Sequence, residues 1–207
     1  MRHSLLCVVA CTLLSASGAF AGLLYDNTTT DTGDTVLYSG GPFTGLGDQI
    51  HLVSPGTAAT ALLQMYNAAT GSGTFDVSLR FYQVGSPVGS QIGGTFILTG
   101  VPTTGQDIIN LQFALGELPL PQDVIFVVSV ANATGGADLG VNMFEPPTVG
   151  SSDNSFLIAQ DGGGFSQEAT NSENVNFQLS DVSAPEPASW SLLAGALAAG
   201  GLLRKRK

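Results

Sequence analysis

Oxygen-bearing side chains are concentrated early in the central part of the chain. Asp26, Asn27, Asp31 and Asp34 follow one another closely, with threonines between them, and Asp48 comes shortly afterwards. Calcium prefers several oxygen ligands held by a flexible loop, so these five residues form a candidate site for a structural calcium ion. The alternative is that Asp and Asn stand here because they favour turns, with no metal involved.

A second candidate site combines an aromatic ring with a positive charge. Arg80 and Tyr82 alternate with the apolar residues Leu79 and Phe81, so they share the polar face of an expected strand. A tyrosine ring offers an apolar face for a sugar together with a polar hydroxyl. These two residues therefore predict a possible sugar-binding platform, although ordinary solvent-facing strand residues follow the same pattern.

The residues needed for catalysis lack a recognisable spacing. His51 alternates with apolar neighbours and is expected to be an ordinary strand histidine. Glycoside hydrolysis uses a pair of carboxylates, but Glu117, Glu145, Glu168 and Glu173 form no evident pair. We expect a protein that is not an enzyme and has no cofactor other than the possible calcium.

The charge distribution excludes one class of partner. The chain has 6 basic and 16 acidic residues, and Arg80 is the only Lys or Arg between Arg2 and Arg204. Nucleic-acid binding requires a cluster of basic residues on one face. A domain with a single cation among so many carboxylates does not provide one.

The first 21 residues have the pattern of a secretory signal peptide. Arg2 precedes an apolar run over 5–14, and Ala19 and Ala21 form a small-x-small cleavage signal. Export by the Sec translocon and cleavage by signal peptidase are therefore expected. A lipoprotein signal ending at Cys11 is the alternative. Both cysteines lie in this segment, so the mature chain would have none.

The last 23 residues combine a short motif, an apolar run and a basic end. Pro185, Glu186 and Pro187 precede the uncharged segment 188–203, which would be about 24 Å long as a helix. The basic tail consists of Arg204, Lys205, Arg206 and Lys207. Basic residues at the end of a membrane helix stay in the cytoplasm, so the central part of the chain should face outward.

Segment 185–207 resembles a PEP-CTERM sorting signal in the order and position of these three parts. The resemblance implies processing by an exosortase, a transpeptidase-like enzyme of the bacterial inner membrane. The protein would be anchored transiently in that membrane and then reach the cell surface, the extracellular matrix or a biofilm. A plain membrane anchor is the alternative.

The central region, residues 22–182, predicts an all-β fold. Apolar residues alternate with polar ones over 75–82 and 174–180, and residues 124–130 are apolar on both faces, as in a central strand. Glycine and proline clusters such as 162–164 separate these runs. We expect a jelly-roll-like β-sandwich of about ten strands, with a signal helix before it and a transmembrane sorting helix after it; a barrel is the alternative.

The central region also resembles the choice-of-anchor β-sandwich domains that precede such sorting tails. The resembling segments are 24–27, 47–50 and 77–82. This resemblance implies a fold and an exported location, but no activity. The expected function is that of a non-enzymatic surface or matrix protein. The alternative is a carbohydrate-binding module that recognises extracellular polysaccharide.

Overall fold

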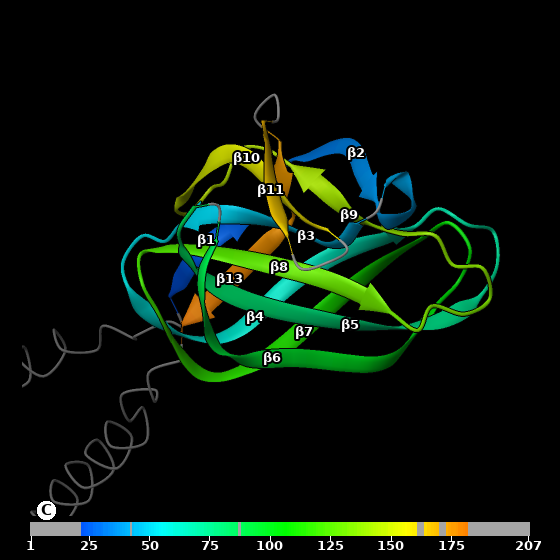
Figure 1. Ribbon diagram of the computed structural model, residues 1–207, viewed down its shortest axis with the longest axis horizontal. Coiled ribbons are helices and arrows are strands. Elements are labelled where there is room, and N and C mark those ends of the chain that lie inside the picture. The colour runs from blue at the N-terminus through cyan, green and yellow to red at the C-terminus, as the bar shows by residue number, and fades with distance from the viewer. Residues whose placement is uncertain (1–21, 42, 87, 161–163, 170–172, 182–207) are drawn as a thin grey trace, which may run out of the picture. The chain divides into compact units, whose positions relative to one another are not determined.

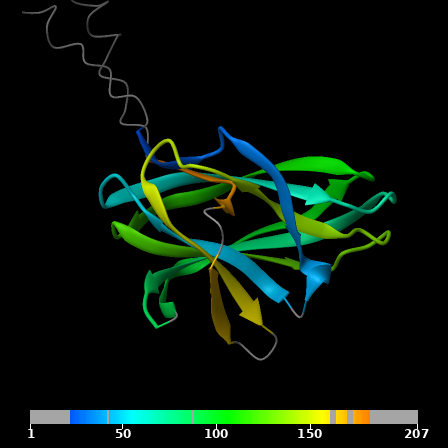
Figure 2. The same ribbon diagram turned by 90° about the horizontal axis from the view of Figure 1, so that it is seen from above.

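The computed structural model describes residues 22–41, 43–86, 88–160, 164–169 and 173–181. The compact unit spans Leu23–Val182 and consists of two antiparallel sheets stacked face to face (Figures 1 and 2). Sheet A contains β1 (Leu23–Asn27), β2 (Asp31–Leu37), β4 (Gly56–Asn67), β7 (Asp107–Leu120), β9 (Leu139–Phe144), β12 (Asn174–Val175) and β13 (Phe177–Asp181). Sheet B contains β3 (Phe43–His51), β5 (Gly73–Val84), β6 (Val88–Thr103), β8 (Asp123–Ala131), β10 (Ser151–Gln160) and β11 (Phe165–Ala169).

The chain passes repeatedly from one sheet to the other. Strands β3, β5, β8 and β10 of sheet B are followed in the sequence by β4, β6, β9 and β11, and β4 and β9 belong to sheet A. Sheet B has the order β11-β10-β3-β8-β5-β6. A short 3-10 helix, η1 (Tyr38–Gly40), precedes β3 in the sequence. Most neighbours in the sheets are therefore distant in the sequence.

The first and last strands of the sandwich lie side by side in sheet A. Strand β1 pairs antiparallel with β13, and Leu23 is opposite Ser180. Strand β13 is also paired with β4 on its other side. The first and last strands of the unit thus close one part of sheet A together.

The core fills the space between the sheets with apolar side chains from both. Phe177 of β13 stacks on Phe126 of β8, with ring centroids 3.8 Å apart and planes within 11°. Phe81 of β5 contacts the same Phe177 ring at 6.2 Å. Burying an aromatic side chain of this size is among the larger stabilising contributions to a domain. This aromatic contact ties the last strand of sheet A to the middle of sheet B.

The expected all-β sandwich is confirmed, with more strands than predicted. The run 124–130 lies in β8, between β3 and β5, and its residues 124–128 are buried on both faces, as its composition indicated. Strand β11 was not predicted, because its segment follows three glycines and has no apolar alternation. In the described part of the chain, no helix has the length and apolar character needed to cross a membrane. The predicted signal peptide and sorting signal lie outside the described residues.

Candidate functional site

Sheet B is curled so strongly that its outer face forms a groove. Strands β11 and β5 are four positions apart in the sheet, about 19 Å if it were flat. The rings of Phe165 on β11 and Tyr82 on β5 nevertheless meet edge to face, with centroids 5.5 Å apart. Sheet B therefore brings the start of β11 close to β5 on its outer face. Figure 2 shows the β10–β11 hairpin projecting outward from the stacked sheets.

Two glycines in β3 make this curl possible. A Cβ on Gly45 would lie 2.7 Å from Val127 of β8 and 3.1 Å from Ala159 of β10. A Cβ on Gly47 would lie 1.9 Å from the Phe126 carbonyl oxygen. Because β3 has no side chains at these positions, its two neighbouring strands close over it.

The groove has a volume of about 370 Å³, within the range of ligand pockets, which is roughly 300–1,000 Å³. It is lined by apolar groups, by the Arg80 side chain and by polar residues. The lining residues are Thr44, Arg80, Tyr82, Val127, Ala159, Gln160, Gly164 and Phe165. None of these described lining residues is acidic.

The structure brings Arg80 and Tyr82 together, but not as the open platform that the sequence indicated. Only 8% of Tyr82 is exposed, because Phe165 and the apolar residues Ile125, Val127 and Leu157 pack around it. The aromatic ring thus forms one wall of the groove. Phe165 was missed from the sequence because its contact depends on the curl of the sheet.

The five candidate calcium ligands do not converge. Asp26 and Asn27 lie in β1, Asp31 and Asp34 lie on the exposed part of β2, and Asp48 points into the core from β3. Among the described residues, no three His, Cys, Asp or Glu side chains stand close enough together to hold a metal ion. The Asn27 amide instead donates hydrogen bonds to the carbonyls of β9 and β12, at 3.2–3.3 Å.

Asp48 is a fully buried carboxyl group. Burial raises its pKa well above the ordinary value of 3.8, and the charge of Asp153 raises the pKa further. The Ser152 hydroxyl lies 3.1 and 3.2 Å from its two oxygens and 2.6 Å from the side-chain oxygen of Asn174. Near this group, the Tyr25 hydroxyl is buried and has no hydrogen-bond partner among the residues that the structure describes. The single Ser152 hydroxyl proton cannot be donated to all of these oxygens at once, so Asp48 is well placed to hold a second proton.

A second carboxyl group is perturbed at the outer edge of sheet A. Burial raises the pKa of Glu173, and a hydrogen bond with Asp34 and the charge of Glu145 raise it further. Two of the four glutamates considered for glycoside hydrolysis therefore lie near each other. Glu117 is exposed on β7, away from this pair, and the side chain of Glu168 is not described.

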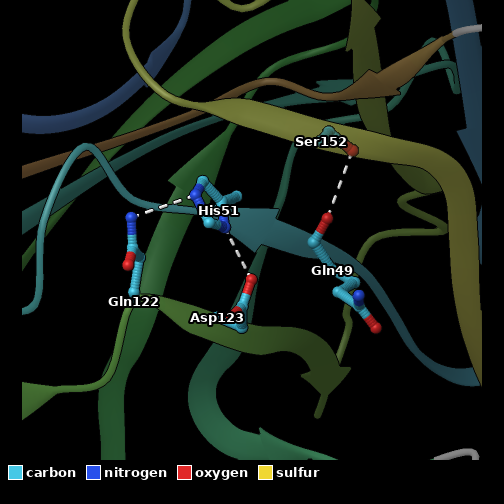
Figure 3. A network of polar contacts seen from close by, with 5 residues as sticks. All are labelled: Gln49, His51, Gln122, Asp123 and Ser152. Atoms are coloured by element: carbon cyan, nitrogen blue, oxygen red, sulfur yellow. Dashed lines mark hydrogen bonds and ion pairs between the residues drawn. The ribbon is translucent and has the colours of Figure 1, made fainter.

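His51 has a hydrogen-bond partner at each ring nitrogen (Figure 3). Nδ1 lies 2.6 Å from Asp123 Oδ1, and Nε2 lies 3.0 Å from the Gln122 amide nitrogen. With the Gln122 amide as donor, Nε2 is an acceptor and Nδ1 carries the proton, which it donates to Asp123. The nearby Ser152 hydroxyl donates to the Gln49 carbonyl, not to this ring. His51 thus lies at the exposed end of β3 with both ring nitrogens hydrogen-bonded.

A row of polar side chains crosses the outer face of sheet A. Asn142 donates to Gln64 at 2.8 Å, Gln64 donates to Asn110 at 3.2 Å, and Thr35 donates to Asn142 at 2.8 Å. Gln64 and Asn110 also line a shallow hollow of about 400 Å³. The side chains of this row satisfy one another, so this face is a weaker candidate than the groove.

The comparisons with known proteins show no family for this chain. No protein-family model and no curated protein match the chain. A solved structure of the infectious bursal disease virus Gx strain aligns with 89% of this chain and 48% of its own chain, with 12% identity and a TM-score of 0.29. The chain thus spans about half the length of that protein, and at this TM-score the likeness carries no argument about fold or function.

Proposed function

We propose that the chain is an exported, non-enzymatic surface or extracellular-matrix protein that an exosortase processes at its C-terminal signal. The signal consists of Pro185, Glu186, Pro187, the apolar segment 188–203 and the basic tail 204–207. In this proposal, residues 1–21 form the signal helix and the apolar segment forms the sorting helix in the inner membrane. After processing, the sandwich remains at the surface or in the matrix.

One observation carries this proposal: the last strand of the sandwich ends before the motif begins. Strand β13 stops at Asp181, and the compact unit ends at Val182, three residues before Pro185. A cut at the motif would therefore leave every described strand and core residue in place. This arrangement suits a domain that is released intact from a membrane tag.

Mass spectrometry of the protein from its native host tests this proposal. We expect the extracellular form to begin at Gly22 and to end near Pro187, without the basic tail. Replacing the three motif residues by alanine should leave a membrane-bound form with an intact C-terminus. A Lys207→Arg control should be processed normally. An unprocessed C-terminus on the extracellular protein would refute the proposal.

We also propose that the sandwich has a jelly-roll topology. The repeated passage of the chain between the sheets, from β3 to β4 to β5 and from β8 to β9 to β10, supports it. Jelly rolls are used by lectin domains among others, so this topology connects the fold with the second candidate function.

The groove on sheet B favours carbohydrate binding as that second function. It joins an aromatic wall to polar groups of Thr44, Arg80 and Gln160 in a volume suited to a short stretch of glycan. A glycan array with the purified protein tests this function. Thr44 is exposed on β3, so Thr44→Phe should fill the groove without disturbing the core and should abolish binding. The control Thr99→Phe, on exposed β6 and outside the groove, should bind normally. Binding that survives Thr44→Phe would place the site elsewhere.

A further inference from the structure

We infer that the groove on sheet B selects acidic glycans, and that the Arg80 guanidinium binds their carboxylate groups. This inference rests on the proposed carbohydrate-binding function and specifies its ligand. The relevant ligand class is a polysaccharide that contains uronic acid residues. The observations that carry the inference are the position and the incomplete pairing of Arg80.

Arg80 lies in the wall of the groove with few partners. It extends from β5 beside Val127 of β8, and one Nη donates a hydrogen bond of 3.0 Å to the Ser129 hydroxyl. Its Nε is buried and has no hydrogen-bond partner in the part of the chain that the structure describes. Among the described residues, no carboxylate forms an ion pair with Arg80. A guanidinium has five N–H donors, so one neutral acceptor leaves most of its hydrogen-bonding capacity unused.

A partly buried charge without a counterion is unfavourable. Taking a charged group out of water has a cost that an ion pair or hydrogen bonds must offset. A ligand carboxylate in the groove would provide both, because guanidinium and carboxylate groups can form two parallel hydrogen bonds. Among its described lining residues, the groove therefore lacks a carboxylate, which is the group that a uronic acid carries.

The other lining residues suit the rest of a sugar ring. Tyr82 and Phe165 form an apolar wall, while Thr44 and Gln160 offer polar atoms for hydroxyl groups. The remaining carboxylates of the domain repel an acidic polymer at long range, but salt screens charges beyond about 8–10 Å. At physiological ionic strength, the direct contact with Arg80 should therefore decide the selectivity.

Oligogalacturonate and its fully methyl-esterified form provide a matched pair of probes. They share one backbone, and only the first carries carboxylates. In calorimetric titrations of the purified protein, we expect the acidic form to bind at least about ten-fold more tightly, as hydrogen bonds to charged groups typically contribute. Arg80→Gln should remove that difference, and Arg80→Lys should retain part of it, because it keeps the charge but loses the planar fork.

The outcomes separate this inference from the function on which it rests. Equal binding of both probes, lost in Thr44→Phe, would overturn the selectivity and leave carbohydrate binding in place. Failure of both probes and of every glycan on the array would overturn both. Thermal unfolding shows whether each variant folds. If Arg80→Gln does not fold, the probe pair with the unmodified protein and with Arg80→Lys still decides.

Discussion

Replacing the buried Asp48 by asparagine should stabilise the sandwich at neutral pH. Asp48 lies on the core-facing side of β3, between Leu46 and Ile50, with none of its surface exposed. Burial is the main reason why its pKa is raised, and the charge of Asp153 adds to it. Asparagine keeps the shape and an oxygen for the Ser152 hydroxyl, but has no charge to bury.

The sign and size of the effect follow from proton linkage. Since the folded state raises the pKa of Asp48, folding favours the protonated form. The contribution of Asp48 to the stability of the unmodified protein is therefore highest below the ordinary pKa of 3.8 and falls as the pH rises through the raised pKa. Within that window the slope is at most about 1.4 kcal/mol per pH unit. The stability of Asp48→Asn does not fall in this way. The stability of the variant relative to the unmodified protein should therefore grow by up to this slope for each pH unit between the ordinary and the raised pKa, and then stay constant.

Urea unfolding, followed by far-ultraviolet circular dichroism between about pH 3.5 and 8, measures this difference. The control is Asp76→Asn, at an exposed residue whose pKa is lowered by hydrogen bonds from Asn132 and the Gly100 amide. In that control the unmodified protein should be the more stable form above the ordinary pKa, and it should lose this advantage as the pH falls. Parallel pH curves for Asp48→Asn and the unmodified protein would refute the reasoning.

Three further substitutions test the packing of the sandwich. Gly47→Ala should destabilise it by about 3 kcal/mol, because the new Cβ would lie 1.9 Å from the Phe126 carbonyl oxygen; Gly94→Ala, with open space at its Cβ, should have little effect in the same denaturation assay. Phe177→Ala removes the ring that joins the sheets and should lower the free energy of unfolding by about 3–5 kcal/mol in urea titrations. His51→Ala removes an exposed hydrogen bond to Asp123 and should change the stability by less than about 1 kcal/mol; a larger loss in thermal unfolding would contradict its assignment to the surface.

The sequence predicted the strands whose residues alternate in polarity, because that pattern depends only on the two faces of a strand. Residues 75–82 fall within β5 for this reason, whereas 124–130 fall within β8 because a short run that is apolar on both faces is typical of a central strand. Asp48 illustrates a signal that was present but not used. A strand that starts at Phe43 places Asp48 on the same face as Leu46 and Ile50, and so in the core.

The groove could not be predicted from local patterns. Tyr82 and Phe165 meet only because β3 carries glycines that let sheet B curl, and this curl depends on contacts among β8, β3 and β10. The alternation around Arg80 and Tyr82 correctly assigned them to one face. It contained no information about the hairpin that covers that face.

The pairing of β13 has a mechanical consequence for a protein held by its C-terminal end. A load applied at Asp181 enters a strand that is hydrogen-bonded to β1 on one side and to β4 on the other. Pulling along this strand must shear two ladders at once, and it must also draw Phe177 out of its stack with Phe126. A tether at this end therefore holds an interior strand of sheet A. A pull at Leu23 instead acts on an edge strand that has one ladder, with β13, and isolated backbone hydrogen bonds of Leu24 and Asp26 outside that ladder.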